Sequence, residues 1–576
     1  MVGGRNGLDA SLTRLRSILS CSTRGVVGAG DGGVPYGPPM ERHLATVWES
    51  VADEVGPEVA VVQGATRLTW SELDDRSARL ASALLDAGVE PGTAVAQYLY
   101  NSPEYLETTF ASLKVRAVPV NVNYRYLDDE LLHLLDDSEA RVLVFHASLG
   151  DRVARVLPRA SRLRLVVEVD DGGPHVDGAV RYEELLAGHH PAARRTRSPD
   201  DITLTYTGGT TGLPKGVMAR IGNGVDATLS STPVLLGHPP VTDPAGAAPL
   251  ARALADAGAR LVGLPACPLM HATGLTIGAV PALSVGGTVV LLDGRGLDVD
   301  ELWTLVDREG VMALTVVGDA FARPMLRGLR DGPPRSLASL RAILSSGAMF
   351  STEVKQGLLE HLPEGAYVLD FIASTEGTMG TSIATRNRPA ATGHFTPSAG
   401  VKVFDEHDRE VEPGSGQGGV VAVPGAIPLG YFKDPAKTAR TFREVDGVAY
   451  SFPGDWATVE ADGSLTLLGR GSQCINTGGE KVFPEEVEEA IKRLPAVDDA
   501  LVFGVPDERF GQRVVAVASA APGGPAPDGA AIVARLREQL SAYKVPREVL
   551  VVDEVPRAPN GKADYPGARA RFEARG

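Results

Sequence analysis

The sequence predicts an α/β protein with a large N-terminal region of β-sheets flanked by helices and a small α+β C-terminal domain. Short apolar runs alternate with amphipathic stretches through most of the 576 residues, and this alternation is typical of parallel sheets covered by helices. A chain of this length is too long for one hydrophobic core. The pattern changes near residues 468–471, ahead of a compact set of about 105 residues, which is a usual size for a domain.

The alternation of strands and helices is clear in the first part of the chain. Residues 60–63 form an apolar strand candidate, and Ser71 is expected to cap the next helix, with Asp74 three residues on completing a capping box. Gly88 is expected to end that helix. Its buried stripe comprises Leu73, Leu80 and Leu84. The pattern then predicts strands at 93–99, 117–122, 141–145 and 163–169, and helices at 103–114 and 129–135.

The end of the chain predicts a separate unit. A strand at 463–468 is expected to close the large region. Behind it we expect helices at 484–492 and 530–540 and strands at 500–505, 514–520 and 548–552. The predicted domains are therefore residues 40–470 and 471–576, with the boundary near 470–472. Residues 1–39 are rich in Gly, Ser and Arg and lack the apolar core of a signal peptide. We expect them to be disordered or to lie upstream of the natural start.

Composition excludes several classes of function. The net charge of −16 argues against nucleic acid as a partner, because binding it needs a basic face. The three cysteines, Cys21, Cys267 and Cys474, are widely spaced, so we expect no disulfide framework and a reducing compartment, the cytoplasm. We expect no membrane span, because no apolar stretch reaches the length of about 18 residues that one requires. The sequence leaves the oligomeric state open and is compatible with a homodimer.

Residues 204–216 are the most informative stretch, because a short strand runs into a loop of glycines and hydroxyls that ends at Lys215. Glycines let backbone N–H groups turn inward around an anion, and threonine hydroxyls add donors. We therefore expect a phosphate site made by Thr207, Gly208, Gly209, Thr210, Thr211, Gly212 and Lys215. The loop is not a Walker A motif, because Pro214 and Gly216 flank the lysine.

This loop resembles the phosphate-binding signature of the acyl-adenylate-forming superfamily, which includes acyl-CoA synthetases, peptide-synthetase adenylation domains and luciferases. Four further segments match that superfamily in order, and together they cover about residues 45–570. The resemblance implies ATP, Mg²⁺ and CoA as cofactors and a small-molecule carboxylic acid as substrate. Residues 119–129 and 479–488 look like those of actinobacterial ligases for fatty or steroid side-chain acids.

The second segment, Ala373-Ser374-Thr375-Glu376, resembles the Gly-x-Thr-Glu motif of the superfamily. The resemblance implies that Glu376 holds the magnesium ion, which suits a hard cation that takes carboxylate and phosphate oxygens. Ile372 and Ala373 stand where an aromatic residue and a glycine usually open the motif. We therefore expect adenine to stack on a neighbour such as Phe371. The resemblance places Ser374 and Thr375 at the nucleotide.

The third and fourth segments add residues for the sugar and for CoA. In Tyr450–Trp456, Asp455 resembles the aspartate that grips the ribose hydroxyls. In residues 469–488, Arg470 matches an arginine that contacts ribose or phosphate, and the hinge position falls on Ser472. The resemblance implies a mobile C-terminal domain. It also implies a tunnel for the CoA arm that involves Gly478, Gly479 and Lys481.

The fifth segment, residues 556–562, ends at Lys562, which matches the adenylation lysine of the superfamily. An ammonium group there can stabilise charge that builds on the attacking oxygen and the α-phosphate. Lys562, Glu376 and Thr207 are thus the implied catalytic residues. Two further features resemble the acyl side. His271 follows Pro268-Leu269-Met270, and Gly347 and Ala348 form a small-residue turn after a strand.

The reading that follows is an acyl-CoA ligase that makes an acyl-adenylate and passes it to CoA. Two alternatives remain open. The acceptor of the first product could be a carrier protein, or nitrite could replace the acid with an aryl amine as acceptor. A catalytically inactive nucleotide-binding module is the other alternative. A dinucleotide-binding dehydrogenase is disfavoured, because no GxGxxG follows an early strand.

Overall fold

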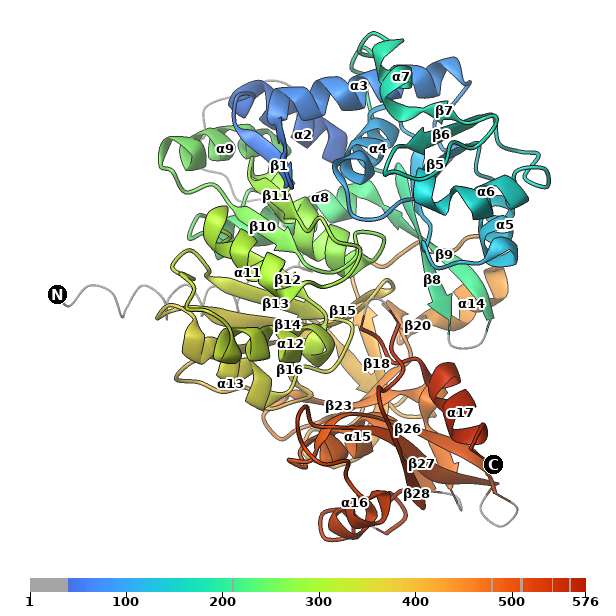
Figure 1. Ribbon diagram of the computed structural model, residues 1–576, viewed down its shortest axis with the longest axis vertical. Helices are drawn as coiled ribbons and strands as arrows, with labels where there is room; N and C mark the ends of the chain where they lie inside the picture. Colours follow the sequence, from blue (N-terminus) through green and yellow to red (C-terminus); the bar gives the residue numbers. More distant parts are fainter. Residues whose placement is uncertain are drawn as a thin grey trace, which may run out of the picture.

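Two large β-sheets and one small sheet, with helices around them, form the protein in a computed structural model (Figure 1). The structure describes residues 40–209, 212–477, 480–507, 511–540, 542–558 and 561–575. The segment 1–39, for which we expect disorder, lies outside the described residues. The mixed α/β architecture confirms the predicted fold class.

The first large sheet carries the predicted phosphate loop. Its strands are β3 (Ala94–Tyr98), β4 (Val118–Asn121), β5 (Val142–His146), β6 (Leu165–Val169), β7 (Val180–Arg181), β8 (Ile202–Gly209), β9 (Gly212–Arg220) and β19 (Gly430–Tyr431). They run in the order β19-β9-β8-β4-β3-β5-β6-β7. The strands from β8 to β7 pair in parallel, whereas β8 and β9 form an antiparallel hairpin.

The second large sheet has a parallel part with antiparallel strands on both sides of it. Its first strands in sequence are β1 (Val59–Gln63), β2 (Thr66–Thr69), β10 (Val262–Pro265), β11 (Thr288–Leu291), β12 (Ala313–Val316), β13 (Ala342–Ser346), β14 (Tyr367–Ser374), β15 (Gly377–Thr385) and β16 (His394–Pro397). The rest are β17 (Lys402–Phe404), β18 (Gly418–Pro424), β20 (Phe442–Val445), β21 (Val448–Ser451), β22 (Asp455–Val459) and β23 (Leu465–Arg470). Pairing is parallel from β1 through β14 and antiparallel beyond. The prediction of parallel sheets is therefore correct for only part of this sheet.

Helices cover and separate the two sheets. They are α2 (Leu44–Val55), α3 (Trp70–Asp86), α4 (Pro103–Lys114), α5 (Asp128–Asp137), α6 (Gly150–Val156), α7 (Tyr182–Ala187), α8 (Ile221–Leu235), α9 (Ala247–Asp256), α10 (Val280–Ser284), α11 (Val299–Arg308), α12 (Gly318–Asp331), α13 (Thr352–His361) and α14 (Pro435–Thr441). Short helical turns lie at Ala147–Leu149 and Pro244–Gly246, and a π-helix lies at Thr273–Ala279. The largest core cluster joins α2, α3 and α4 to side chains of both sheets, such as Val61 and Val95. Burial of this apolar surface holds the two sheets together.

The start of α3 differs from the expectation. Thr69, rather than Ser71, caps the helix, and its hydroxyl accepts a hydrogen bond from the backbone N–H of Glu72 at 3.2 Å. The Glu72 carboxylate accepts from the Thr69 N–H at 2.8 Å and completes the capping box. Asp74 instead contacts Lys114. The buried stripe of Leu73, Leu80 and Leu84 is confirmed.

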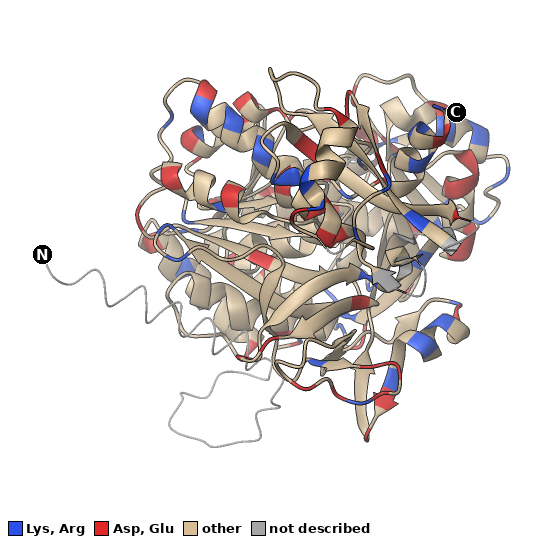
Figure 2. Cartoon of the chain, turned by 90° about the horizontal axis from the view of Figure 1, so that it is seen from below, with Lys and Arg blue, Asp and Glu red and all other residues tan. Residues whose placement is uncertain are grey.

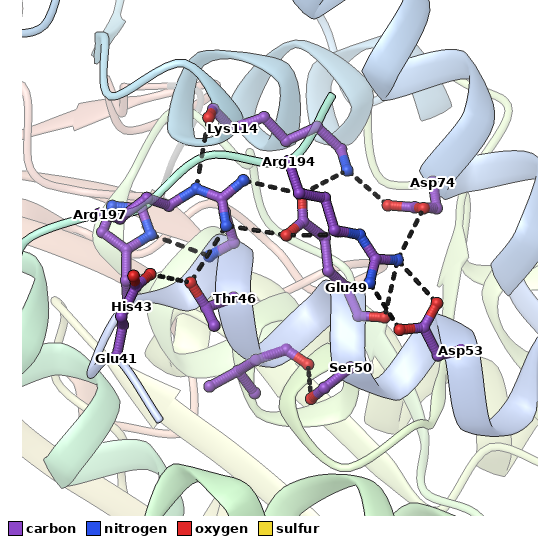
Figure 3. A network of polar contacts seen from close by, with 12 residues as sticks. Glu41, His43, Thr46, Glu49, Ser50, Asp53, Asp74, Lys114, Arg194 and Arg197 are labelled. Carbon is purple, nitrogen blue, oxygen red and sulfur yellow. Dashed lines mark hydrogen bonds and ion pairs between the residues drawn. The ribbon is translucent and has the colours of Figure 1, made fainter. Parts of the chain in front are cut away.

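A network of buried charges fixes the chain before β8 (Figure 3). Glu49 on α2 pairs with Lys114 on α4 at 2.9 Å and with Arg197 at 2.8 Å, and all three residues are buried. Breaking such a pair costs about 3–5 kcal/mol, because the remaining charge is left uncompensated. Arg116 and Asp201 add a further pair at 2.7 Å immediately before β8. The network thus anchors the strand that leads into the predicted phosphate loop.

The C-terminal unit, orange to red in Figure 1, lies at the opposite end of the molecule from α2 and α3. A short helical turn at Gly471–Gln473 follows β23 and leads into the unit. Its strands are β24 (Ile475–Thr477), β25 (Glu480–Val482), β26 (Val497–Asp507), β27 (Gly511–Ala520) and β28 (Glu548–Val552), and its helices are α15 (Pro484–Lys492), α16 (Gly529–Leu536) and α17 (Tyr565–Glu573). The expected α+β character of this unit is confirmed.

The surface carries both signs of charge. Figure 2 shows acidic and basic residues interspersed over the outer helices. Among the described residues, no helix combines the length and the apolar character that a membrane crossing needs.

Candidate active site

The predicted phosphate loop belongs to the antiparallel hairpin of β8 and β9, in which Thr207 is paired opposite Lys215. Thr210 and Thr211 lie outside the described residues, and so do the side chains of residues 208–213, which include Gly208, Gly209 and Gly212. The Lys215 ammonium pairs with Asp434 at 2.6 Å, and the Lys215 side chain is 44% exposed. Asp434 caps α14, and the Lys215 ammonium holds the pKa of that carboxyl below its usual range. The predicted phosphate lysine is therefore neutralised in part by a residue that the sequence did not single out.

Glu376 lies in the tight turn between β14 and β15. Its backbone N–H donates to the Ser374 hydroxyl at 3.2 Å, next to Thr375. The Tyr431 hydroxyl donates to the Glu376 carboxylate at 2.5 Å, and burial followed by the Glu376 charge raises the pKa of Tyr431. Tyr431 was not predicted, because only the pairing of β19 with β9 brings it here. The second carboxylate oxygen of Glu376 leaves capacity for a cation.

Asp455 and Arg470 face each other across the antiparallel strands β22 and β23. The Arg470 Nε lies 3.6 Å from Asp455 Oδ1. Asp455 Oδ2 is buried and has no hydrogen-bond partner within the described part of the chain. Burial raises the pKa of Asp455, and the Glu376 charge adds to this, while Arg470 opposes it. A buried carboxylate oxygen without a partner suits a ligand that brings hydroxyl donors.

Lys562 reaches into the same region from the loop between β28 and α17. A Cβ added to Gly347 would lie 3.3 Å from Lys562 Cε, so the lysine stem runs beside this glycine. Gly347 has φ +93°, a backbone conformation that favours glycine. Burial and Arg470 lower the pKa of Lys562, whereas Glu376 and Asp455 oppose that shift. These mutual effects show that Lys562, Arg470, Glu376 and Asp455 lie close together.

The turn at Gly347 and Ala348 follows β13, and Ser346 is paired with Phe371 of β14. Phe371 is partly buried. Ile372 points instead into an apolar cluster, because successive residues of a strand face opposite sides. Phe371 therefore lies on the other face of β14, where it packs against the cluster of Ala342, Leu344 and Leu369.

His271, which the resemblance places near the acyl group, lies two residues ahead of the π-helix at Thr273–Ala279. Burial, with a contribution from Lys562, lowers the pKa of His271 to about 3, so its ring is neutral at neutral pH. The Asn121 side chain donates to the backbone oxygens of Tyr206 at 2.9 Å and Met270 at 2.8 Å, and it accepts from the Tyr206 N–H at 2.7 Å. This residue joins the phosphate hairpin to the His271 segment, and the sequence did not reveal it.

Lys481, one of the predicted CoA residues, belongs to the hairpin of β24 and β25. Gly478 and Gly479 lie outside the described residues, and so does the side chain of Lys481, whose backbone is paired with Asn476. The turn that holds Ser472 lies between β23 and this hairpin.

The donor set at Glu376 fits magnesium in a nucleotide site. Within the described ranges no group of three or more His, Cys, Asp or Glu residues gathers to hold a metal ion. Magnesium bound with a nucleotide commonly takes one or two protein carboxylates and completes its shell with phosphate oxygens and water. Glu376, which is half-buried and close enough to Lys562 to influence its pKa, would supply one such carboxylate.

The fold and the charged groups around the Gly347 turn are those of an adenylate-forming enzyme. The family model described as "AMP-binding enzyme" matches residues 48–432, and "AMP-binding enzyme C-terminal domain" matches residues 486–562. The chain belongs to the AMP-binding enzyme family, which confirms the resemblance drawn from the five motifs.

Relatives match along almost the whole chain. A 3-oxocholest-4-en-26-oate–CoA ligase of Rhodococcus rhodochrous is 41% identical over 560 residues, which cover 92% of this chain and 96% of the relative. A medium/long-chain-fatty-acid–CoA/3-oxocholest-4-en-26-oate–CoA ligase of Mycobacterium tuberculosis is 41% identical over 540 residues, with the same coverage of both chains. The crystal structure of ATP-bound MatB from Rhodopseudomonas palustris superposes with a TM-score of 0.75 at 24% identity, over 93% of this chain and 99% of MatB. That likeness shows the shared fold.

Proposed function

We propose that the protein is an AMP-forming acyl-CoA ligase. It joins a carboxylic acid to the AMP part of ATP, releases pyrophosphate, and transfers the acyl group to CoA. The family and the relatives named as CoA ligases support this function. The observation that carries it is the convergence of Lys562, Glu376, Asp455 and Arg470 beside Gly347.

In the first half-reaction a carboxylate oxygen of the acid attacks the α-phosphorus of ATP, and the bond to pyrophosphate breaks. The protein's task is to position the reactants and to stabilise charge. The hairpin from Thr207 to Lys215 holds the leaving pyrophosphate, and Asp455 accepts from the ribose hydroxyls. Lys562 stabilises negative charge between the attacking oxygen and the α-phosphate. Glu376 would hold Mg²⁺, which neutralises phosphate charge when bound.

In the second half-reaction the CoA thiol attacks the acyl carbonyl carbon and AMP leaves. Lys562 has no task in this step, and its place is needed for the approach of the thiol. We propose that the C-terminal unit rotates about the turn at Gly471–Gln473 and that this rotation brings Gly478 and Gly479 to the acyl group. We also propose that the boundary between the N-terminal and C-terminal domains lies between residues 470 and 471, at the start of this turn.

The substrate proposed is an apolar carboxylic acid, of the steroid side-chain or medium- to long-chain fatty type. The named relatives support this class. The state of His271 fits it as well. With its pKa lowered to about 3, the imidazole is neutral at neutral pH and adds no charge beside an apolar acyl chain.

A screen of acids tests the function. Purified protein is incubated with ATP, Mg²⁺ and each acid, and pyrophosphate is measured with and without CoA, followed by mass detection of the product. We expect pyrophosphate with the apolar acids and acyl-CoA only when CoA is present. If pyrophosphate is released with nitrite plus an aryl amine but with none of the carboxylic acids, the result would overturn the proposal in favour of diazotisation. Binding of ATP without turnover on any acid would favour an inactive nucleotide-binding module.

A further inference from the structure

Helix α12 contacts both the segment that carries Gly347 and the C-terminal unit that carries Lys562. At its start, the Gly318 N–H donates to the Ser345 hydroxyl at 3.1 Å. One residue further, the Asp319 carboxylate accepts from the Ser351 N–H at 2.9 Å. These bonds hold the two ends of the segment that carries Gly347. The start of α12 therefore sets the position of the turn that lies beside the lysine.

The outer side of α12 contacts the C-terminal unit. Arg327 pairs with Asp498 of β26 at 2.9 Å. Gly561, next to Lys562, packs against the helix: a Cβ at Gly561 would lie 2.8 Å from Ala320 Cβ and 3.2 Å from a ring carbon of Phe321. The catalytic loop thus docks on α12 at one point, and the ion pair ties the same unit to the helix at a second point.

Asp498 is also coupled to the catalytic loop through its own strand. The adjacent Asp499 pairs with Arg557 through two hydrogen bonds, at 2.5 and 2.7 Å. Arg557 donates to the Gly561 carbonyl at 3.2 Å. The Ala558 N–H donates to the Lys562 carbonyl at 2.8 Å. Asp499 therefore stabilises the loop that carries Lys562 through Arg557, while Asp498 joins the same strand to α12.

We propose that Arg327 and Asp498 form an interdomain latch that favours the arrangement in which Lys562 lies beside Gly347. They act as positioning residues for adenylate formation only. This inference rests on the proposed function, because the latch has to open when the C-terminal unit rotates for thioester formation. Neither residue touches the cleft. Their effect is a shift in the population of the two arrangements.

The exposure of the pair limits the size of the effect. The side chains of Arg327 and Asp498 are 41% and 29% exposed, so solvent screens their attraction. Ion pairs of this kind shift an equilibrium by about two- to fivefold. Arg323 also faces Asp498, although it is held by Asp319 at 3.0 Å. Removal of Arg327 alone therefore leaves some attraction, whereas a reversed charge converts it into repulsion.

The test measures the two half-reactions separately in Arg327→Ala, Arg327→Asp, Asp498→Arg and the double variant Arg327→Asp/Asp498→Arg. We expect Arg327→Ala to slow adenylate formation about two- to fivefold and each single reversal to slow it more. Thioester formation from supplied acyl-AMP is expected to stay unchanged or to become faster. The double variant is expected to recover most of the adenylate-forming rate. Arg330→Ala on the same helix is the matched control and is expected to resemble the unmodified protein.

Two results would overturn the latch. One is an equal loss in both half-reactions with a normal melting temperature, and the other is a double variant no better than the worse single one. Arg327→Lys guards against misfolding, because it keeps the charge and is expected to stay closer to the unmodified protein than Arg327→Ala. Failure of the unmodified protein to release pyrophosphate would count against the proposed function instead. The two failures are thus told apart.

Discussion

At the scale of single residues, the site depends on charges that come from strands and loops far apart in the sequence. Lys562, Glu376, Asp455 and Arg470 were each predicted from a short motif. Tyr431, which bonds Glu376, and Asp434, which pairs with Lys215, carry no such signal, because only the pairing of β19 with β9 brings this part of the chain to the site. Sequence motifs thus predict the residues of a site but not the side chains that form hydrogen bonds and ion pairs with them.

Replacement of Lys562 by Ala tests its role. We expect adenylate formation to fall by about 10²-fold or more, because an oriented charge at the reacting oxygens is lost. Thioester formation from supplied acyl-AMP is expected to be largely spared. Pyrophosphate release and acyl-CoA formation are measured in separate assays. Equal loss in both would refute the role.

Asn121 allows a second test at this scale, with Asn101 as its matched control. Asn121 bonds both Tyr206 and the His271 segment, whereas Asn101 bonds only Cys267 and Leu269 in that segment. A hydrogen bond contributes about 1 kcal/mol. Asn121→Ala is therefore expected to raise the KM for ATP and for the acid by about tenfold or more. Asn101→Ala is expected to raise only the KM for the acid. A normal KM for ATP in Asn121→Ala would contradict the bridging role.

At the scale of elements, the sequence predicted individual helices and strands well where local signals were strong. The helices Pro103–Lys114 and Pro484–Lys492 and the strand Glu548–Val552 begin and end as expected. A proline at the first helical position marks the start of both helices. The capping box of α3 is ambiguous in the sequence, because Ser71 with Asp74 has the same spacing as Thr69 with Glu72, which forms the box in the structure. The antiparallel half of the second sheet was missed, since its pairing depends on contacts between distant segments.

The capping box of α3 makes a prediction for stability. Thr69→Ala removes the side-chain acceptor for the Glu72 N–H and is expected to lower the free energy of unfolding by about 1 kcal/mol. The first melting transition is followed by circular dichroism. Thr66→Ala in the neighbouring strand β2, where Thr66 is exposed, is a suitable comparison. A smaller loss for Thr69→Ala than for Thr66→Ala would contradict the assigned cap.

At the scale of the whole molecule, buried histidines couple stability to pH. Burial, reinforced by Arg295, lowers the pKa of His146 to about 4, and Asp171 opposes this shift. The unfolded chain takes up a proton near pH 6.5, whereas the folded protein takes it up only near pH 4. The unfolded state therefore binds more protons in this window. The stability contributed by neutral His146 is complete above pH 6.5 and is lost as the pH falls toward 4.

His146→Gln tests this coupling, because glutamine does not titrate and can still accept from the Tyr100 N–H. The fall in melting temperature between pH 7 and pH 5 is expected to be smaller in the variant. Each histidine of this kind contributes about 1.4 kcal/mol per pH unit across the window. An unchanged fall in melting temperature would show that His146 does not couple to folding.

The central claim is that the bond between the α- and β-phosphates of ATP is broken by a carboxylate in the cleft that Lys562 enters. The most direct test uses an acid that is active in the screen, labelled with oxygen-18 in its carboxylate, and determines the label in each product by mass spectrometry. The account predicts one labelled oxygen in AMP and none in pyrophosphate. Label in inorganic phosphate alongside ADP, or AMP free of label, would contradict it.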